Sequence, residues 1–348
     1  MSRARDFADL AGSAAGGGLT GANALINGQF AVAQRGTSFT SGSNDDTDYT
    51  LDRWKLFSDG NDIVDVTQET STVPTNRQTA IALDVETANK KFGIAQIIEQ
   101  KNCVNLIGET VTLSFQAKVS ATTNLDNVKA AIIAWDGTAD TVTADMISAW
   151  GVEGTNPTLA TNFTYENTPA NLNLTTSYAT YSVTASVDTA SAKNIIVFIF
   201  SDVTTTSAGE FLYITDVKLE AGQAATPFGH EDVGTTLANC QRYYVQLVNG
   251  DANSICNGNV LNSGGANQVR GVVQFPVEMK AAPAVVSNSG TNYFTIEGQV
   301  SFDGPFSIAH HTTRAGLLYV GSVSGTNGAS GTLRSQNASA SVALNAEL

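Results

Sequence analysis

The stretch of sequence that decides the fold is Phe211-Leu-Tyr-Ile-Thr-Asp-Val-Lys-Leu-Glu-Ala-Gly-Gln-Ala-Ala-Thr-Pro-Phe228. Its large apolar residues fall on one side of an extended chain: Phe211, Tyr213, Val217 and Leu219. Its charged residues fall on the other side: Asp216, Lys218 and Glu220. A period of two is typical of a β-strand with one buried face. Gly222 and Pro227 then stop the strand, because neither favours a strand interior. The stretch therefore predicts a half-buried strand that closes a domain.

Similar strand patterns occur upstream. Residues 111–119 and 179–187 alternate between apolar and polar side chains, whereas residues 195–200 are continuously apolar, as in a central strand covered on both faces. Two Asp-Gly pairs mark hairpin turns: Asp59-Gly60 and Asp136-Gly137. Segments 91–100 and 141–150 also fit short helices. The strand signals dominate, so we expect an all-β sandwich of two antiparallel sheets.

A second domain is predicted to begin near Thr235. Its turns are marked by Asn-Gly and Asp-Gly pairs: Asn249-Gly250, Asn257-Gly258, Asp303-Gly304 and Asn327-Gly328. Glycines at 16–18 and 21 separate the N-terminal residues from the first strand signals. The predicted organisation is therefore an N-terminal peptide over residues 1–24, a first domain over 25–230 and a second, smaller domain over 231–348.

Motifs at both ends of the first domain resemble a known family. The domain opens with Leu25-Ile-Asn-Gly-Gln-Phe30, followed by Gln34-Arg-Gly36 and Asp52-Arg-Trp54. With the closing stretch, these motifs resemble the jelly-roll module, similar to carbohydrate-binding modules, of bacteriophage tail fibres and other virion-surface proteins. Cys240-Gln-Arg-Tyr-Tyr244 and Phe275-Pro-Val-Glu-Met-Lys-Ala-Ala-Pro283 look like the C-terminal domain that often follows it. The resemblance implies a jelly-roll β-sandwich followed by a smaller β-sandwich.

Composition excludes several classes of partner. The chain has 18 basic and 32 acidic residues, a net charge of −14, and it lacks the basic footprint that nucleic-acid binding requires. Three cysteines cannot all pair with one another, which favours folding in a reducing compartment such as the host cytoplasm. Charged residues interrupt the region where an apolar leader core would lie, and the longest apolar run is too short to span a bilayer. We therefore expect no membrane insertion.

The first residues carry a short helical pattern. Phe7 and Leu10 fall on one face of it, beside Arg3 and Arg5. A helix this short is not stable alone in water, so it must dock on a partner or fray. The family resemblance implies the first outcome, a virion-anchoring peptide made by Arg3, Arg5, Phe7 and Leu10.

The residues that usually carry catalysis are sparse, and we expect no catalytic residues. His310 and His311 are adjacent, and neighbours on a strand point to opposite faces. No nucleophile elbow, phosphate loop or zinc-binding helix is present. Acidic clusters at 45–48 and 59–65 supply carboxylates, so a glycan hydrolase stays open as a minor alternative, since glycosidases need only two.

A structural calcium ion is implied by the resemblance alone. In related carbohydrate-binding modules the ion lies where the opening and final strands meet, which makes Asp216 the candidate ligand, with Asn27 and Gly28 as further oxygen donors. The family often has an acidic residue directly after the first-strand phenylalanine, but this chain has Ala31 there, which weakens the site. The alternative is that Asp216 bonds to neighbouring residues. Otherwise no cofactor is expected.

Three tryptophans could stack on sugar rings or fill the core. Trp54 matches a core position of the family, whereas Trp150, which precedes Gly151, is predicted to be the exposed one and a candidate glycan contact.

The resemblance implies a non-enzymatic fibre or spike on the virion surface, anchored by residues 1–24, forming a homotrimer and attaching to host-surface glycan or protein. The alternative within the same ancestry is a capsid decoration or head-fibre protein that binds the major capsid protein.

Overall fold

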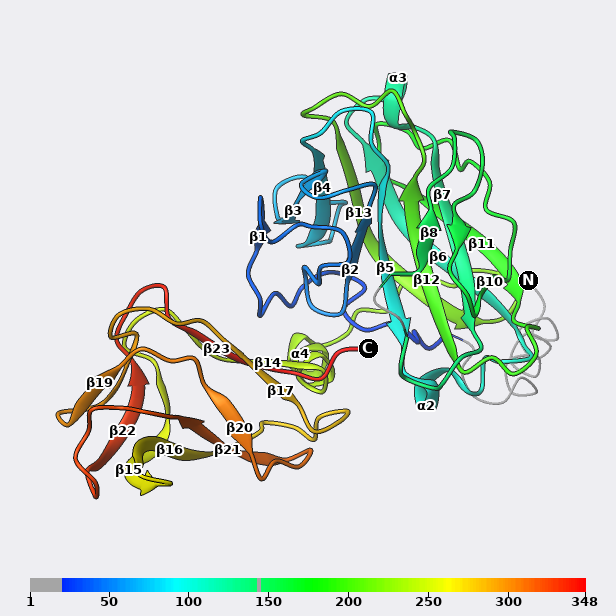
Figure 1. The fold of residues 1–348 in the computed structure, drawn as a ribbon. Coiled ribbons are helices and arrows are strands. Elements are labelled where there is room, and N and C mark those ends of the chain that lie inside the picture. Colours follow the sequence, from blue (N-terminus) through cyan, green and yellow to red (C-terminus); the bar gives the residue numbers. More distant parts are fainter. Residues whose placement is uncertain (1–20, 143–144) are drawn as a thin grey trace. The chain divides into compact units, whose positions relative to one another are not determined.

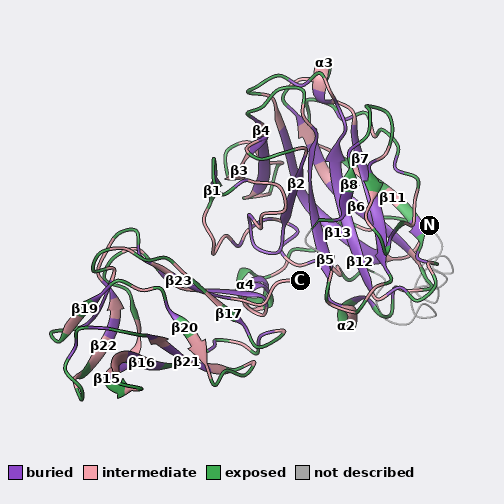
Figure 2. Cartoon of the chain, viewed as in Figure 1, coloured by how far each residue is buried: buried purple, intermediate pink, exposed green. Residues whose placement is uncertain are grey.

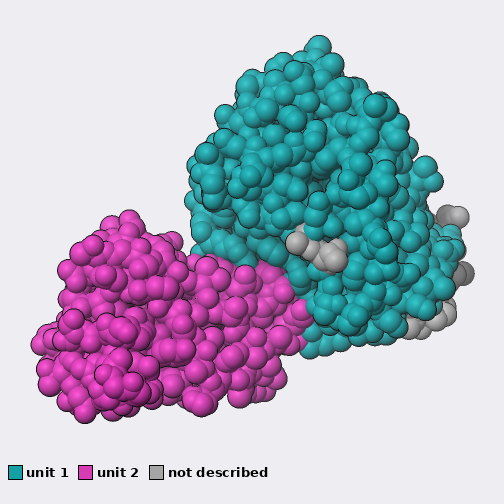
Figure 3. All heavy atoms as spheres, in the orientation of Figure 1, with its two compact units in different colours: residues 1–233, 348 teal, residues 234–347 magenta. Residues whose placement is uncertain are grey.

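The computed structural model describes residues 21–142 and 145–348. The chain divides into two compact units, coloured separately in Figure 3. Unit 1 holds the described residues up to Val233 together with Leu348, and unit 2 holds Gly234–Glu347. This division falls close to the predicted boundary after residue 230. The predicted anchor residues Arg3, Arg5, Phe7 and Leu10 lie outside the described residues.

Unit 1 is a β-sandwich, as predicted, and its two main sheets are drawn in Figure 1. Among the described residues, six antiparallel strands form one sheet, in the spatial order β1 (Ser38–Phe39), β3 (Val64–Glu69), β4 (Ala80–Val85), β13 (Phe211–Ala221), β6 (Thr110–Val119) and β11 (Ala179–Ser186). Five form the other, in the order β10 (Phe163–Tyr165), β7 (Val128–Trp135), β12 (Asn194–Ser201), β5 (Phe92–Ile98) and β2 (Lys55–Ser58). A small hairpin and two short helices complete the described part: β8 (Ile147–Ala149), β9 (Thr158–Leu159), α2 (Gln100–Cys103) and α3 (Thr122–Leu125).

The five-stranded sheet is covered on both faces. In β12, Ile195, Val197 and Ile199 pack into the core between the sheets. Its alternate residues Ile196, Phe198 and Phe200 pack into a second apolar cluster on the other face. The strand is accordingly buried along its whole length, as Figure 2 shows. This confirms the prediction for residues 195–200. The neighbouring β5 is a strand, so the helical interpretation of residues 91–100 is wrong.

The closing strand β13 contains a β-bulge that the alternation did not predict. Its pairing with β6 shifts between Thr215 and Lys218, and Asp216 in the bulge has a φ of 54°. Leu212 and Ile214 face the core before the bulge, and Val217 and Leu219 face it afterwards. One extra residue therefore reverses which positions face the core. The predicted placement of Phe211 and Tyr213 on the core side is wrong; both rings lie on the outer face and stack on each other with centroids 5.5 Å apart.

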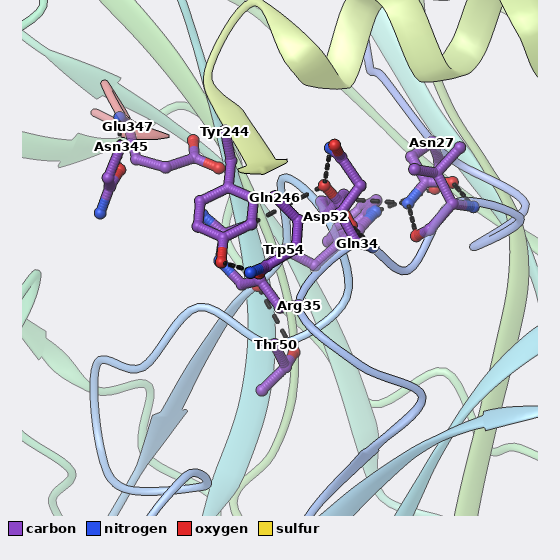
Figure 4. Close-up of polar contacts among 11 residues, drawn as sticks. Asn27, Gln34, Arg35, Thr50, Asp52, Trp54, Tyr244, Gln246, Asn345 and Glu347 are labelled. Atoms are coloured by element: carbon purple, nitrogen blue, oxygen red, sulfur yellow. Dashed lines mark hydrogen bonds and ion pairs between the residues drawn. The ribbon is translucent and has the colours of Figure 1, made fainter. Parts of the chain in front are cut away.

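The opening motifs form a buried polar network, drawn in Figure 4. The Asn27 side chain donates to the carbonyl oxygens of Val32 and Asp52 at 2.9 and 3.0 Å, and it accepts from the Val32 amide at 3.0 Å. The Asn27 carbonyl accepts the indole N–H of Trp54 at 3.0 Å. The Asp52 carboxylate accepts the backbone and side-chain N–H groups of Gln34 at 2.6 and 2.7 Å. The motifs are therefore structural, and Trp54 is fully buried in the core, as predicted.

Unit 2 is the predicted second, smaller β-sandwich. Its described strands form a sheet of seven, in the order β19 (Val300–Phe302), β18 (Phe294–Ile296), β22 (Ser330–Ser335), β15 (Ser254–Ser263), β16 (Ala266–Gln274), β21 (Ala315–Val320) and β20 (Ser307–Ala309). A sheet of three has the order β14 (Tyr244–Asn249), β23 (Ser341–Asn345) and β17 (Ala284–Ser287). Helix α4 (Val233–Gln241) spans the division between the units. A separate core lies within unit 2, and it includes Val260, Phe294 and Leu333.

Two further predictions concern helices and cysteines. Among the helices of the described residues, none is both long enough and apolar enough to cross a membrane. Cys103, Cys240 and Cys256 form no disulfide bond with one another. Burial raises the pKa of the Cys103 thiol to about 11, so this thiol is a poor nucleophile at neutral pH.

Candidate functional site

A polar cleft of about 320 Å³ lies on the outer face of the six-stranded sheet of unit 1. It is lined by Arg77, Ser114, Phe115, Gln116, Thr180, Asp216, Thr226, Pro227 and Phe228. Strands β6, β11 and β13 supply the floor, because Gln116 pairs with Thr180 on one side and with Thr215 on the other. The segment before β4 and the segment after β13 supply the walls.

Asp216 lies at the centre of the cleft floor. The bulge in β13 turns its side chain toward Arg77, whose Nε donates to both carboxylate oxygens at 2.7 Å. The side-chain amides of Gln29 and Gln116 donate to the two oxygens at 3.0 and 2.6 Å. The Asp216 side chain is only 3% exposed, whereas that of Arg77 is 25% exposed. The carboxylate is therefore fully satisfied, and the guanidinium is fixed in place with one edge toward solvent.

One wall of the cleft is held in place by a buried ion pair. Lys218 and Glu220 both lie on the outer face of β13, 3.2 Å apart, and each is almost completely buried. They bind the returning chain at Thr226, whose amide and hydroxyl donate to Glu220 at 2.7 Å each. Lys218 donates to the Thr226 hydroxyl at 2.5 Å and to the Pro227 carbonyl at 3.3 Å. This network holds Pro227 and Phe228 against the cleft. It also shows that the charged side of the closing strand, which the alternation placed opposite the core, is itself buried at Lys218 and Glu220.

Several polar groups of the cleft have no hydrogen-bond partner among the described residues. They are Nη2 of Arg77, Oε1 of Gln116 and the hydroxyl groups of Ser114 and Thr180. The set combines a fixed charged donor, a neutral acceptor and two hydroxyls that can act in either role. Such a set suits a polyhydroxylated ligand, whose vicinal hydroxyl groups both donate and accept.

An aromatic platform borders the cleft along β6 and β13. Lys118 lies two residues from Gln116 on the same face of β6, about 7 Å along the strand. Its ammonium group lies 5.3 Å from the ring centroid of Tyr213 and 5.8 Å from that of Tyr178. Tyr213 stacks in turn on Phe211. Burial raises the pKa of the Tyr213 and Tyr178 hydroxyls, and the nearby Glu69 carboxylate raises them further, so both rings stay neutral.

The predicted calcium ligands do not fit a calcium ion. The opening and final segments do meet, since the Val217 amide donates to the Gly28 carbonyl at 2.9 Å. However, the Arg77 guanidinium already neutralises Asp216, and the side-chain and backbone oxygens of Asn27 accept protein N–H groups. Within residues 21–142 and 145–348, no group of three or more His, Cys, Asp or Glu side chains is arranged to hold a metal ion. The structure agrees with the other possibility raised from the sequence, in which the Asp216 carboxylate bonds to neighbouring side chains.

The prediction that Trp150 is exposed is wrong. Its side chain is 9% exposed and lies in the apolar cluster on the outer face of the five-stranded sheet. Its ring lies 6.1 and 6.4 Å from the rings of Phe198 and Phe200. The indole is therefore a packing residue and presents no open face to a sugar.

Sequence reasoning missed Arg77 and Phe228 as cleft residues. Gln116 and Ser114 did carry a signal, because both fall on the polar side of the predicted strand 111–119. Nothing in the sequence could pair Arg77 with Asp216, since the two residues are 139 positions apart and meet only through the bulge.

Comparison with known proteins gives structural neighbours only. No protein-family model matches the chain, and no curated protein matches it. Solved structures that it resembles include the enzymatically active domain of bacteriophage CBA120 tailspike protein 4, with 17% identity, a TM-score of 0.35 and coverage of 57% of this chain and 21% of that one. A protein from Bacteroides thetaiotaomicron that is described as sugar-binding aligns with 16% identity and a TM-score of 0.35. The alignment covers 57% of this chain and 100% of that one. The CBM22-1 xylan-binding domain of Paenibacillus barcinonensis Xyn10C aligns with 13% identity, a TM-score of 0.31 and coverage of 59% and 98%. The chain thus spans about a fifth of the tailspike chain, and alignments this distant say nothing about ligand or activity.

Proposed function

We propose that this protein is a non-enzymatic surface component of a bacteriophage virion and that the polar cleft of unit 1 binds a glycan on the host surface. The observation that carries the glycan proposal is the set of unpaired polar groups around the fixed Arg77–Asp216 pair. The virion assignment comes from the resemblance of the opening and closing motifs to phage fibre modules.

The cleft chemistry supports a saccharide over an apolar ligand. Arg77 and Gln116 offer a donor and an acceptor whose positions are fixed by Asp216, so little side-chain entropy is lost on binding. Pro227 and Phe228 offer an apolar wall against which the C–H groups of a sugar ring can pack. A shallow site of this kind binds weakly, so attachment depends on many copies acting together.

The carboxylates of the cleft argue against hydrolysis. Glycoside hydrolysis ordinarily uses two carboxyl groups on opposite sides of the scissile bond. The residues that line this cleft include one carboxylate, Asp216, and it is held in an ion pair with Arg77. A group so tightly paired is poorly suited to act as a general acid or a nucleophile.

On this proposal, residues 1–24 attach the chain to other virion proteins, and copies of the chain form a homotrimer at the virion surface. Several copies would raise the effective concentration of weak sites without any new contact. Attachment to the capsid instead of the tail would give the head-fibre alternative, with the same glycan cleft.

The cleft can be tested by blocking it. Thr180 is exposed on β11, so Thr180→Arg should fill the cleft while Arg77 and Asp216 keep their own side chains. We expect binding of the labelled protein to a bacterial-glycan array, and to host cells, to fall at least tenfold. Ser186→Arg is the matched control, because Ser186 is exposed on the same face of the same strand, about 20 Å away.

Two results would contradict the proposal. Equal binding by Thr180→Arg and Ser186→Arg would place glycan recognition elsewhere. Release of reducing ends from host polysaccharide, lost in an Asp216→Asn variant that still melts cooperatively, would make the protein a hydrolase.

A further inference from the structure

The outer face of the seven-stranded sheet in unit 2 carries two adjoining hollows. One has a volume of about 570 Å³ and the other of about 230 Å³, and they share Arg270 and Leu317. The first is otherwise lined by Asn257, Gly258, Asn259, Leu261, Gly271 and Val272. The second is otherwise lined by Gln268, Ala309, His310 and Tyr319. Together they form one groove, here called the unit 2 groove, across β15, β16, β21 and the end of β20.

Strand alternation explains why these side chains point outward. Val260, Val269 and Leu318 face the unit 2 core, so the residues between them face the other way. The register then places Asn259 beside Arg270 on β16, and Arg270 beside Tyr319 on β21. Three polar side chains from neighbouring strands therefore form a row across the sheet, on a floor of hydrogen-bonded backbone. The histidines predicted as strand residues instead follow β20, and His310 lies at one end of the groove.

Arg270 is the central cation of the unit 2 groove, and no acid neutralises it. Its Nε and Nη2 atoms both donate to the side-chain oxygen of Gln268, at 3.0 and 2.8 Å. These bonds fix the guanidinium and leave Nη1 without a hydrogen-bond partner among the described residues. By contrast, two other arginines of unit 2 pair with carboxylates: Arg314 with Glu278 and Arg334 with Glu297.

The lining of the groove is free of acidic residues. Neither hollow is lined by an Asp or Glu, although the whole chain carries 32 of them and a net charge of −14. An oriented, unneutralised guanidinium in such a place favours an anion, and its planar fork matches a carboxylate. Charge complementarity therefore points to an acidic ligand.

Apolar groups flank the same cation. Val272 is 63% exposed and Leu261 is 37% exposed, both unusual for large aliphatic side chains on a folded domain. Val272 pairs with Leu317 across the sheet, so the apolar surface is continuous beside Arg270. Aliphatic surface beside a charged donor and amide groups suits a sugar ring, which has C–H faces and a polar edge.

We propose that the unit 2 groove is a second binding site, for an acidic saccharide whose carboxylate pairs with Arg270. Its hydroxyl groups would bond to Asn257, Asn259 and Tyr319, while the ring packs on Val272 and Leu317. The proposal does not rest on the unit 1 cleft, since the two sites share no residue. An acidic capsule or uronic-acid polymer would then bind to unit 2 even if unit 1 bound nothing.

The test is isothermal titration of the full chain with oligogalacturonate, an alginate oligosaccharide and a sialic-acid oligomer. We expect at least one to bind, with affinity that falls as salt rises. The methyl ester of the bound oligosaccharide, which keeps the ring and loses the charge, should bind at least tenfold more weakly. Arg270→Gln should abolish binding, and Ser186→Arg, on exposed unit 1 surface outside the cleft, should leave it unchanged.

Arg314→Gln is the matched control, because it removes the same charge from an exposed site of the same unit. If Arg270→Gln and Arg314→Gln lost the same amount of oligosaccharide affinity, the effect would come from the net charge of the protein. The proposed site at Arg270 would then be wrong. Failure of all three oligosaccharides to bind would also overturn it.

A second variant distinguishes a saccharide site from an interface between two copies of the chain at the unit 2 groove. Val272→Asp places a carboxylate beside Arg270, so it should abolish oligosaccharide binding while the sedimentation coefficient stays that of the parent protein. A change of oligomeric state in Val272→Asp would assign the face to a second copy of the chain and overturn the saccharide proposal.

Discussion

Asp84 on β4 carries a carboxyl group in surroundings that disfavour its ionisation. It pairs across the sheet with Asp65, and Glu86 lies nearby. Burial, followed by repulsion from Glu86 and Asp65, raises the pKa of Asp84 from 3.8 to about 6. One of its oxygens is buried without a hydrogen-bond partner in the described residues. The folded state therefore takes up a proton at Asp84 at a higher pH than the unfolded chain does.

This difference fixes the sign of the pH dependence. Above about pH 6 the group is ionised in both states, and the folded state bears the full cost of the charge. As the pH falls from 6 to 3.8, the folded state is protonated first, so the contribution of Asp84 becomes more favourable. Asp84→Asn should therefore stabilise unit 1 at pH 7.5 by about 1 kcal/mol, a value reduced for partial exposure, and by much less at pH 4.

Urea denaturation at the two pH values measures this effect. Asp136→Asn is the control, since Asp136 is exposed directly after β7 and loses the same charge. If Asp84→Asn gave the same gain at both pH values, the raised pKa would not be its cause.

The first and last segments of unit 1 approach each other so closely that one position must be glycine. A Cβ atom added at Gly28 would lie 2.1 Å from the carbonyl oxygen of Val217, next to the bulge in β13. The Asn23 side chain binds the same carbonyl at 3.0 Å, and the Ala24 amide donates to the carbonyl of Leu219 at 2.9 Å. The fold of unit 1 thus already includes Asn23 and Ala24, which precede the predicted start at residue 25.

Gly28→Ala should therefore destabilise unit 1 by at least about 2 kcal/mol, because backbone must move to admit the methyl group. The same shift would displace the bulge and Asp216, so we also expect weaker glycan binding in the unit 1 cleft. Gly229→Ala is the control, since a Cβ there meets no atom within 4 Å and needs no positive φ. A Gly28→Ala melting curve equal to that of Gly229→Ala would contradict this account.

Strand positions could be predicted from the sequence because burial leaves a local trace. The alternation at 111–119 and the unbroken apolar run at 195–200 report how many faces of each strand are covered. The bulge at Asp216 leaves no such trace. The residues on either side of it keep an apparent period of two, although the positions that face the core change from even to odd numbers across the bulge. The burial of Trp150 could not be predicted from the sequence either, because it depends on contacts with Phe198 and Phe200, which are distant in sequence.

The candidate sites were harder to predict than the strands for the same reason. Sequence spacing shows which residues share a face of one strand, such as Ser114 and Gln116. It does not show which strands become neighbours, and therefore not that Arg77 reaches Asp216 or that Arg270 lies between Asn259 and Tyr319. Sites made by cross-strand partners follow from topology, which short-range patterns determine only in part.

Each unit has a hydrophobic core of its own, and this predicts two separate unfolding events. Leu113 is buried between the sheets of unit 1, and Leu333 is buried in the core of unit 2. Truncating a buried leucine to alanine costs about 2–5 kcal/mol through lost burial and a residual cavity. We expect two calorimetric transitions, with Leu113→Ala lowering one midpoint and Leu333→Ala lowering the other, each by roughly 10 °C. Val152→Ala and Val286→Ala are the controls, because both valines are more than half exposed. A single transition that both leucine variants lower equally would mean that the two cores unfold as one cooperative body.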